Sequence, residues 1–541
     1  MKFIRKLFSG NHTASLLPVV IIAVVSFAVY FNTLSNGFVY DDNAQISENP
    51  WIRDIRSVPV IFSQNVWSFR EGGTSNYYRP LMHIIYMFTY YLFGLAPWGF
   101  HLVNVLFHTA NSVLVFLITM RLLAGKLTGG QAGGPGNLPA SGSATGYQGW
   151  QAGKLSSPPF IAALLFAAHP IHTEAVAWVA GLPDLVYSFF FLLSVYFYTR
   201  AEEGYDRFYF LSLIAFFLAA ISKEPAMMLP FILIAYDSAF GKGGSIFPGR
   251  FLRYIPYAII GGAYILLRVH ALKGFAPNTA LEAPAYSGYI INVFPLFAEY
   301  LRDLFFPVDL RFWHTFHPVQ SVFTLKWMLS LLITAVYAGI CVAAWKKDRA
   351  AFLGLLLIAL PLLPALYIKG IGGKPYAERY LYLSSAGFVM LAAMFLHWLP
   401  QRMPRRSFIA AIVALLLAGL YSLQTIRRNP VWENDLILFT DTVKKAPDAA
   451  LPRRMLGNTL LDMGKVDEAI EQYRIALSLD DNSSTGHANL GLAFMKKGLT
   501  GEAIREYQRA VTIDPNDIEA HLGLGKAYAG SGRTDEAIEQ Y

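Results

Sequence analysis

The sequence has little charge and almost no cysteine for its length. Asp, Glu, Lys and Arg make up 15% of its 541 residues, whereas soluble domains carry about 25%. This scarcity, together with a hydrophobic fraction of 55%, excludes a soluble enzyme. Cys341 is the single cysteine and lies within an apolar run, so the chain forms no disulfide framework, zinc knuckle or redox pair of its own.

A nucleotide-binding loop of the Walker type is also missing. No Gly-Lys pair in the chain is followed by Ser or Thr. The charge that is present divides the chain, because residues 431–541 carry 12 Lys/Arg and 18 Asp/Glu, which leaves the whole positive excess to residues 1–430. Positive charge in a membrane region fixes orientation in the bilayer, so it argues against nucleic acid as a partner.

Apolar runs long enough to cross a bilayer recur between residues 16 and 425. The first, at 16–34, follows Lys2, Arg5 and Lys6 and has no convincing small-residue cleavage site, so we interpret it as an anchor in contact with membrane lipid and not as a cleaved signal. Ten further spans are predicted at 99–121, 159–178, 184–199, 208–222, 226–240, 254–270, 322–345, 351–368, 379–398 and 407–425.

Short basic connections orient these spans. The connections at 200–207, 242–253, 346–349 and 402–406 all lie in the cytoplasm if residues 271–321 stay outside. The apolar stretch Tyr289 to Phe306 is then an interfacial or re-entrant piece, although it is long enough to span. A twelve-span arrangement would place the basic residues at 346–349 outside, which the positive-inside rule disfavours. We therefore predict about 11 spans, with loop 35–98 outside and a flexible, Gly-rich cytoplasmic insertion at 124–158.

The C-terminal part, 431–541, contains a repeat of 34 residues. Four columns keep this spacing: Leu456, Leu490 and Leu524; Gly464, Gly498 and Gly532; Ala469, Ala503 and Ala537; and Tyr473, Tyr507 and Tyr541. This period is typical of tetratricopeptide repeats, which stack helix pairs into an α-solenoid with a concave peptide-binding face. The last repeat is expected to be incomplete. The predicted fold is all-α: a polytopic membrane domain at 1–430 followed by a solenoid.

Ionisable residues gather on the outer side of the predicted topology. They are Asp41, Asp42, Arg79, His169, His172, Glu174, Asp184, Lys223, Glu224, Arg268, Lys374, Glu378 and Arg379. Such residues at span ends are costly unless they pair, line water or take part in chemistry, so the one-sided gathering predicts an aqueous site. The alternative is that each is a paired or snorkelling interfacial residue.

Several short motifs occur in a characteristic order. They are Val39-Tyr40-Asp41-Asp42 with Ile46 and Asn49, Tyr78-Arg79-Pro80-Leu81, Phe100-His101-Leu102-Val103-Asn104 with His108, His169-Pro170-Ile171-His172-Thr173-Glu174, Ser222-Lys223-Glu224, Ala377-Glu378-Arg379-Tyr380-Leu381-Tyr382 and Arg428-Asn429-Pro430-Val431-Trp432. With the repeats, they resemble the transmembrane and tetratricopeptide repeat-containing O-mannosyltransferases. The resemblance implies a GT-C glycosyltransferase fold, a polyprenyl-phosphate-linked sugar donor and a catalytic acidic residue in the first outer loop.

Elementary chemistry agrees with these implications. A hydroxyl acceptor is a poor nucleophile near neutral pH, and Asp41 or Asp42 could take its proton as it attacks the anomeric carbon. The lipid phosphate that leaves needs cations or other donors nearby. We assign donor binding to Arg79, His101, His169, His172, Glu174, Lys223, Glu224, Arg268, Glu378 and Arg379. Direct attack would invert the anomeric centre, whereas double displacement would use Glu174, Glu224 or Glu378 as the nucleophile.

Two readings of the polar residues stay open. We expect no required cofactor, but the pair Asp41-Asp42 would suit a divalent ion that bridges the donor phosphate. His169 and His172 would close the donor pocket by hydrogen bonding, or would form a plain interfacial pair.

Three function classes compete. The first is an integral membrane glycosyltransferase that moves a hexose such as mannose to a hydroxyl of a protein or other acceptor held by the repeats. The second is a non-enzymatic scaffold anchored in the membrane, which would leave the acidic loop unexplained. A transporter usually carries midplane charges and repeated halves, and the sequence has neither. Short loops and the Gly-rich insertion favour a bacterial chain, with the active site and the repeats at the periplasmic face of the inner membrane. In a eukaryotic chain the site would face the lumen of the endoplasmic reticulum.

Overall fold

The computed structural model describes residues 16–70, 73, 75–128, 155–201, 205–241, 251–274, 286–366, 376–398 and 406–541. Over these residues the chain forms α-helices, short 3₁₀ and π turns and connecting segments, and none of them forms a strand. The predicted all-α fold is therefore confirmed. The expected insertion at 124–158 falls largely on residues 129–154, which lie outside the described residues.

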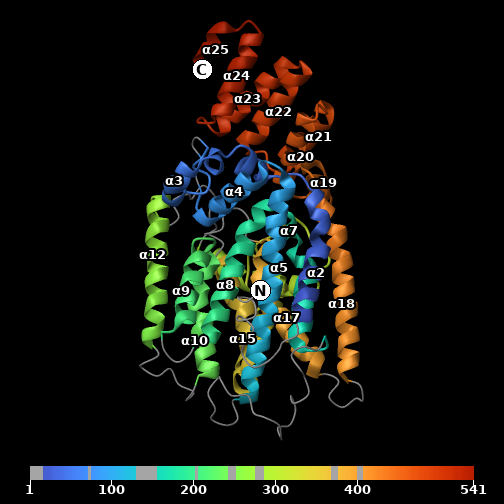
Figure 1. The fold of residues 1–541 in the computed structure, drawn as a ribbon. Helices are drawn as coiled ribbons and strands as arrows, with labels where there is room; N and C mark the ends of the chain where they lie inside the picture. The colour runs from blue at the N-terminus through green and yellow to red at the C-terminus, as the bar shows by residue number, and fades with distance from the viewer. Residues whose placement is uncertain are drawn as a thin grey trace. The chain divides into compact units, whose positions relative to one another are not determined.

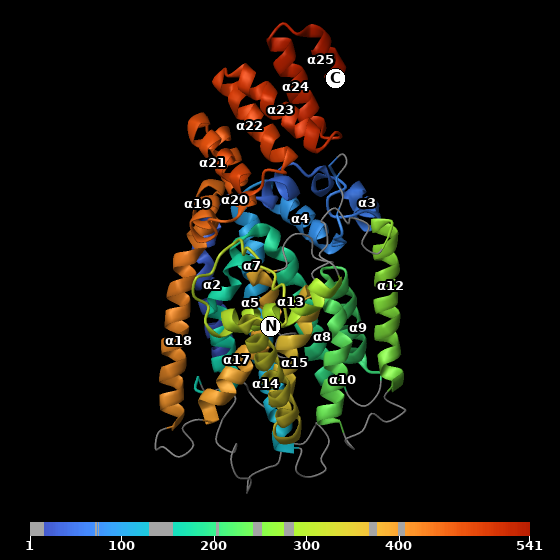
Figure 2. The ribbon, with the colours of Figure 1, turned by 180° about the vertical axis from the view of Figure 1, so that it is seen from behind.

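Contacts within the chain divide it into two compact units. Unit 1 comprises Met1–Leu310 and Phe316–Pro430, and unit 2 comprises Arg311–Thr315 and Val431–Tyr541. Figure 1 shows unit 1 as a set of long helices that run roughly parallel to one another, and Figure 2 shows the opposite side, where α13 and α14 come into view. The proposed domain limits at 430 and 431 stay a prediction.

The described residues of unit 1 include eight helical stretches that are long and apolar enough to cross a membrane. They are Leu16–Ser35, Pro97–Leu123, Val179–Arg200, Leu252–Leu272, Leu325–Lys347, Arg349–Leu366, Glu378–Trp398 and Phe408–Trp432, the last of which continues for two residues into unit 2. A bent pair, Pro158–Ala168 with Pro170–Ala177, passes the same test as one broken span, and Arg207–Ala220 is a shorter apolar helix. The chain is thus a multi-pass membrane protein.

The helices behind these stretches have their own bounds. They are α2 (Leu16–Tyr30), α5 (Pro97–Thr128), α6 (Pro158–Ala168), α7 (Thr173–Ala177), α8 (Leu182–Arg200), α9 (Arg207–Ala220), α10 (Leu229–Phe240), α12 (Ile255–Leu272), α14 (Leu325–Lys347), α15 (Arg349–Ala359), α16 (Leu363–Leu366), α17 (Leu381–Trp398) and α18 (Arg406–Arg428). The loop after α2 holds α3 (Val58–Ser63) and α4 (Pro80–Phe93).

Three predicted spans differ in form from the expectation. The span predicted at 159–178 bends by 46° between α6 and the following turn. His169 is extended there, with φ −62° and ψ 122°, because the ring of Pro170 disfavours the helical conformation of the preceding residue and supplies no N–H. The spans predicted at 208–222 and 226–240 are the short helices α9 and α10, separated by the 3₁₀ helix η7 (Glu224–Met228).

The helix α13 (Tyr286–Phe305) covers most of the stretch predicted to be interfacial or re-entrant. It contains Glu299, Arg302 and Asp303. It is not among the helices of the described residues that are long and apolar enough to span. The number of spans nevertheless stays a prediction.

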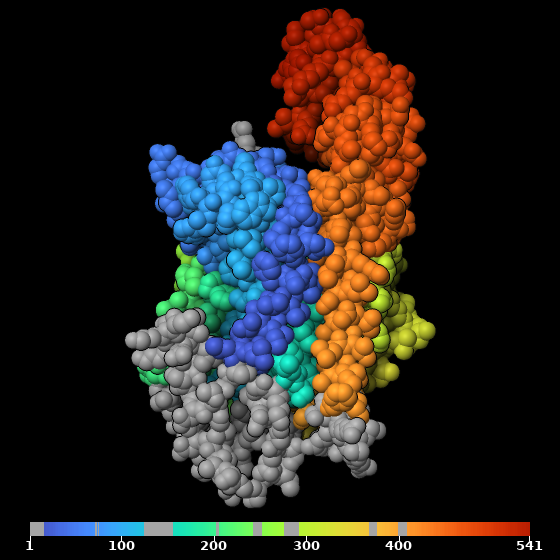
Figure 3. All heavy atoms as spheres, turned by 45° about the vertical axis from the view of Figure 1, so that its right-hand side comes forward, coloured from blue at the N-terminus to red at the C-terminus, as the bar shows by residue number. Residues whose placement is uncertain are grey.

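The centre of unit 1 consists of α5, α6, α8 and α17, which pack against one another. Every residue of α6 is buried. By contrast, α14 buries Ser330 and Ala344 and exposes most of its apolar side chains, as expected of a helix surrounded by lipid. Figure 3 shows α2, in dark blue, and α18, in orange, side by side on the surface.

Unit 2 is a series of helix pairs. Its helices are α19 (Asp435–Lys445), α20 (Ala450–Asp462), α21 (Val466–Leu479), α22 (Ser484–Lys497), α23 (Thr500–Ile513), α24 (Ile518–Gly530) and α25 (Thr534–Gln540). The glycine column Gly464, Gly498 and Gly532 lies in the turns inside the pairs, with φ of 76°, 80° and 74°, a conformation that favours glycine. A Cβ at Gly457 would come within 2.5 Å of the Tyr473 ring, so glycine is required for this close helix packing.

Charged residues of the described part of unit 1 gather at the two opposite ends of its helices. Asp42, Asp184 and Lys223 lie at one end, which we call the aspartate end. Arg200 closes α8, and a helix of 19 residues is about 28 Å long, so Arg200 lies at the opposite end. Lys347 ends α14, and Arg349 there donates to the carbonyl of Ala239 at the end of α10.

We expect thiol labelling to show which end of the helices faces the outside of the membrane. In a background with Cys341→Ser, Arg56→Cys in the first loop and Lys496→Cys in the repeats should react with a membrane-impermeant maleimide from outside intact cells. Lys347→Cys should react after the membrane is permeabilised, because its connection is cytoplasmic in the eleven-span arrangement. Labelling of Lys347→Cys in intact cells would instead support twelve spans.

Candidate functional site

The aspartate pair lies in a constrained turn. Tyr40, which precedes it, has φ of 52°, in the left-handed region that non-glycine residues seldom adopt. A π-helical turn, η2 (Asn43–Ser47), follows directly, and such turns are frequent at functional sites. The first loop therefore holds Asp41 and Asp42 in a fixed conformation.

The two aspartates have different surroundings. Asp42 is fully buried, and its carboxylate accepts hydrogen bonds from the backbone N–H groups of Val39 at 3.1 Å and Ala180 at 2.7 Å. It thereby ties the first loop to the turn before α8. Asp41 is half-buried. Of the two, Asp41 has the side chain that solvent reaches.

Seven charged residues form an ion-pair network at the same end. Four are cations and three are carboxylates: Arg79, Lys223, Arg268 and Arg379, with Glu174, Asp184 and Glu224. In this network Glu174 pairs with Arg379 and Asp184 with Lys223, while Glu224 contacts both Arg268 at 2.7 Å and Arg79 at 3.6 Å. The side chains are at most 24% exposed.

Separate chain segments supply these charges. Asp184 is in the first turn of α8, Arg268 is in the last two turns of α12, and Glu174 is in the first turn of α7. Lys223 and Glu224 precede Pro225, where Lys223 is extended with φ −162° and ψ 145°. Folding brings together residues that are up to 300 positions apart in the sequence.

Aromatic rings join the aspartate turn to the network. The Tyr40 and Trp178 rings have centroids 6.1 Å apart, and the Arg379 guanidinium lies 5.3 Å from the Trp178 ring. Lys223 Nζ lies 4.7 Å from the Tyr380 ring. The Trp178 ring therefore contacts both Tyr40, the residue before Asp41, and the Arg379 cation.

The pKa of Tyr77 depends on charged groups from both the first loop and the ion-pair network. Burial raises the pKa of Tyr77. The cations Arg79 and Arg379 act to lower this pKa, whereas the carboxylates Glu224 and Asp41 act to raise it further. All four charged groups therefore lie within electrostatic range of one phenol. The Arg79 guanidinium also stacks 4.3 Å from the Tyr77 ring centroid. Asp41 thus shares a site with cations of the network.

The charged states at the site follow from burial and pairing. Burial lowers the pKa of Lys223 to about 8, although Asp184 opposes this shift. Burial acts against ionisation of Glu224, but Arg79 and Arg268 outweigh it and hold the pKa of Glu224 below its usual range. Near neutral pH Glu224 is therefore ionised and Lys223 is charged, with the pKa of Lys223 about one unit above neutrality.

The structure places the predicted histidines in the interior of the helix bundle. His101 bonds to the Gly37 carbonyl at 3.2 Å, His172 to the Ser385 hydroxyl at 2.7 Å, and His169 accepts from the Ile171 N–H at 3.2 Å. All three are fully buried. They support the helices and loops around the site, and their assignment to donor binding stays a prediction.

Glu378 has a similar position. It is fully buried and pairs at 3.1 Å with Arg428, the last residue of α18. The side chain of Asn429 bonds in turn to the carbonyl of Val29. Glu378 therefore connects the end of α18 to the segment that carries Arg379, and its assignment to donor binding also stays a prediction.

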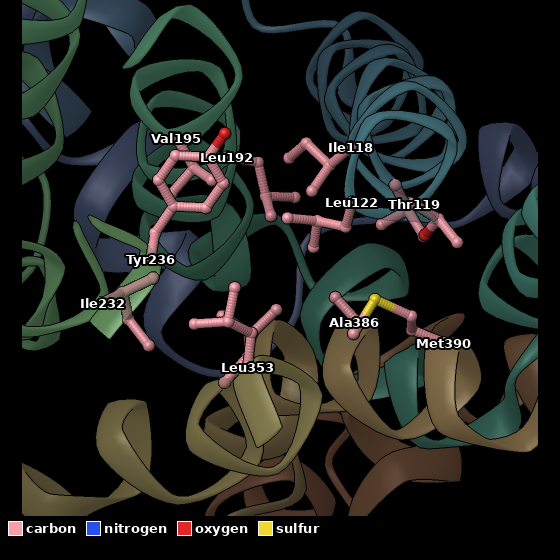
Figure 4. Close-up of a pocket in the computed structure, with 12 residues that line it drawn as sticks. Ile118, Thr119, Leu122, Leu192, Val195, Ile232, Tyr236, Leu353, Ala386 and Met390 are labelled. Atoms are coloured by element: carbon pink, nitrogen blue, oxygen red, sulfur yellow. The ribbon is translucent and has the colours of Figure 1, made fainter. Parts of the chain in front are cut away.

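A small apolar cavity lies deeper in the bundle. Its lining includes Ile118 of α5, Leu192 of α8, Ile232 of α10, Leu353 of α15 and Met390 of α17 (Figure 4). Its open volume is about 30 Å³, which is room for little more than one water molecule. It contains no predicted site residue and is too small for a sugar.

Metal ligands are not concentrated anywhere in the described part of the chain. No group of three or more His, Cys, Asp or Glu side chains there is arranged to hold an ion. The predicted two-aspartate metal site would need further ligands from the donor or from water. Whether the protein requires a cofactor stays a prediction.

The sequence groups Asp184 with the other ionisable residues but gives it no role. The structure makes it a member of the network, with partners on two other segments. Tyr77, Trp178 and Tyr380 also belong to the site, although the sequence attributed most aromatic residues to lipid contact and core packing. Tyr77, two residues before Arg79, and Tyr380, next to Arg379, were the available signal.

Comparisons with known proteins bear on both units. The tetratricopeptide repeat family model matches residues 454–518. The chain is 26% identical over 471 residues to a protein O-mannosyl-transferase of Caenorhabditis elegans. This match covers 85% of this chain and 62% of that protein. It is 26% identical to the protein O-mannosyl-transferase TMTC4 of Mus musculus, with 84% of this chain and 65% of that protein covered. It is 25% identical to the protein O-mannosyl-transferase TMTC3 of Homo sapiens, with 89% of this chain and 53% of that protein covered.

These comparisons confirm the resemblance that the motifs indicated, and they extend it over most of the chain. The chain spans between half and two thirds of the length of these curated relatives. Among solved structures, MamA is 24% identical to this chain with a TM-score of 0.19, and the match covers 24% of this chain and 73% of MamA.

Asp42→Asn should destabilise the protein more than Asp41→Asn. An amide has one oxygen for two N–H donors, so either Val39 or Ala180 would face an NH₂ group and stay unsatisfied. An unsatisfied buried donor costs about 1–3 kcal/mol. Thermal unfolding in detergent should show this loss for Asp42→Asn, while Asp41→Asn stays close to the wild type. Equal losses in the two variants would contradict the anchoring role of Asp42.

Proposed function

We propose that the chain is an integral membrane glycosyltransferase. It moves a hexose, mannose by its resemblance to the relatives, from a polyprenyl-phosphate donor to a hydroxyl group of a protein on the outer side of the membrane. In a bacterium the reaction takes place at the periplasmic face of the inner membrane, and in a eukaryote in the lumen of the endoplasmic reticulum.

One observation carries this proposal. A half-buried carboxylate, Asp41, follows Tyr40, whose ring lies against Trp178, and the Arg379 guanidinium lies against the same Trp178 ring at one end of a bundle of apolar helices. A lipid-linked phosphate sugar has its charged group at the membrane surface, so it meets such a site with its lipid still in the bilayer. A scaffold that only binds proteins has no need of paired cations beside a constrained aspartate. The printed names of the relatives point to the same reaction class.

The reaction step uses Asp41 as a general base. The acceptor oxygen attacks the anomeric carbon and its proton passes to the Asp41 carboxylate. The bond between the anomeric carbon and the phosphate oxygen breaks, and its electron pair leaves with the polyprenyl phosphate. Arg79, Lys223 and Arg379 stabilise the charge on that oxygen. Asp42 holds the turn through two backbone N–H groups and does not need to react.

The charge balance of the network suits such a donor. Its four cations exceed its three carboxylates by one positive charge. The ionised Asp41 carboxylate offsets this excess, so a sugar phosphodiester, which carries one negative charge, meets a site that is rich in cations but close to neutral overall. A sugar diphosphate would bring a second negative charge into a buried region, which is costly without another cation.

The pairing of the other carboxylates supports an inverting reaction. Glu174 is bound to Arg379, Glu224 to Arg79 and Arg268, and Glu378 to Arg428. A double displacement would need one of them to leave its cation and attack the sugar. Single displacement with Asp41 as the base leaves these pairs in place.

The repeats are proposed to bind the protein acceptor. Within unit 2 the first helices of successive pairs pack against each other, α20 on α22 and α22 on α24, and so form one continuous face. In solenoids of this kind this face binds extended peptides. Leu492 and Leu522 lie on these helices and are each 43% exposed, so they can contact a bound chain.

Asp41→Asn should lower turnover by about 10²–10⁴, the usual contribution of a general base. The assay is sugar transfer by the purified protein in detergent or nanodiscs, with a panel of polyprenyl-phosphate sugars and protein acceptors. Glu48→Gln is the control, because Glu48 is an exposed carboxylate of the same loop that pairs with Arg70. Full turnover of Asp41→Asn would remove the proposed base, and no transfer by the wild type from any donor would refute the function.

Leu492→Glu combined with Leu522→Glu should raise the acceptor KM while the donor KM and the rate with a simple hydroxyl acceptor stay unchanged. Leu479→Glu is the matched control, because Leu479 is also 43% exposed but lies at the end of α21, a second helix of a pair. If the double variant glycosylates proteins with the wild-type KM, or if Leu479→Glu has the same effect, the repeats do not bind the acceptor by this face.

A further inference from the structure

One buried carboxylate of the ion-pair network has no part in the chemistry described above. Asp184 is 2% exposed and lies in the first turn of α8, where the helix N-terminus favours a negative charge. Its Oδ1 is 2.5 Å from Lys223 Nζ, and its Oδ2 is 3.9 Å from Arg379 Nε. Asp184 therefore lies between two cations that come from different parts of the chain.

The two cations depend on Asp184 to different degrees. Glu174 binds Arg379 twice, through the backbone N–H at 2.9 Å and through the guanidinium. Arg379 would therefore keep a carboxylate partner if Asp184 were absent. For Lys223 the close carboxylate is Asp184 itself, and a guanidinium keeps its charge in proteins whereas a buried ammonium loses it readily.

Charged and aromatic groups from several neighbouring segments surround Lys223. Arg79 and Arg379 repel its positive charge, and burial also favours the neutral amine. Glu224, the next residue, attracts the charge but also pairs with Arg268. The Tyr187 and Tyr380 rings lie 5.9 Å and 4.7 Å from the ammonium. Among these neighbours Asp184 is the one in direct contact.

We propose that Asp184 is a positioning residue that keeps the Lys223 ammonium charged and holds it beside Arg379, so that the two cations form a ready site for a phosphate group. The effect on turnover rests on the proposed function, but the charge of Lys223 is measurable without it.

The first measurement is the titration of Lys223 itself. Competitive acetylation of the full-length protein at a series of pH values, read by mass spectrometry, should give a midpoint of about 8 for Lys223 in the wild type. Removing an opposite charge in contact shifts such a midpoint by about 1–3 pH units, so Asp184→Asn should lower it by that amount. Lys326, which is half-exposed, serves as an internal reference.

Asp237→Asn is the matched control for this titration. It also removes a carboxylate from the helices of unit 1, but Asp237 contacts the hydroxyl groups of Tyr198 and Tyr254 instead of a cation of the network. It should leave the Lys223 midpoint unchanged. An unchanged midpoint in Asp184→Asn, or an equal shift in Asp237→Asn, would overturn the proposal.

The second measurement is the pH profile of kcat/KM for the donor, which reports groups of the free enzyme. It should fall above about pH 8 in the wild type, because Lys223 then becomes neutral. In Asp184→Asn the fall should come at lower pH, and a midpoint near 6 would cost about tenfold at pH 7. Lys223→Arg stays charged, so its profile should lose this fall. A Lys223→Arg profile that still falls at the wild-type pH would contradict the proposal.

A third comparison covers the case in which Asp184→Asn does not fold. In a Lys223→Met background no ammonium is left to be charged, so adding Asp184→Asn should cost no further turnover. A further loss there would show that Asp184 acts in another way. If Lys223 titrates as expected but the wild type transfers no sugar, the proposed function fails while the role of Asp184 in charging Lys223 stands.

Discussion

Charge that is removed from water must be paired, and this constraint shapes the aspartate end of unit 1. An isolated buried ion costs several kcal/mol or more, so each cation of the network has a carboxylate partner. The partners come from different helices, as with Glu174 of α7 and Arg379 before α17. Each ion pair is therefore also a tie between two segments, and together they fix the arrangement of the helix ends.

The same constraint explains the division of labour between the two aspartates. Asp42 is fully buried, and backbone N–H groups satisfy its charge. Asp41 is half-buried beside a left-handed tyrosine and keeps access to water. The buried Asp42 thus fixes the turn, and the neighbouring Asp41 stays accessible to solvent. Strain at Tyr40 is tolerated because the surrounding contacts over-determine the turn.

Local patterns in the sequence were sufficient for much of the fold. Runs of about 20 apolar residues predict spans because a bilayer has a fixed thickness, and the described helices follow those runs closely. The 34-residue columns predict helix pairs because each repeat buries the same positions. The bend at His169 also has a local cause in Pro170, although the apolar run continues through it.

What the sequence by itself determined was the class of each segment, since hydropathy and repeat period are local properties. It also singled out Asp41, Asp42 and the four cations. Tertiary structure alone decided which charge pairs with which, because partners such as Glu174 and Arg379 are 205 positions apart. Only the fold could give Asp184 its place between Lys223 and Arg379 and distinguish the buried Asp42 from Asp41, since burial depends on contacts made by distant segments.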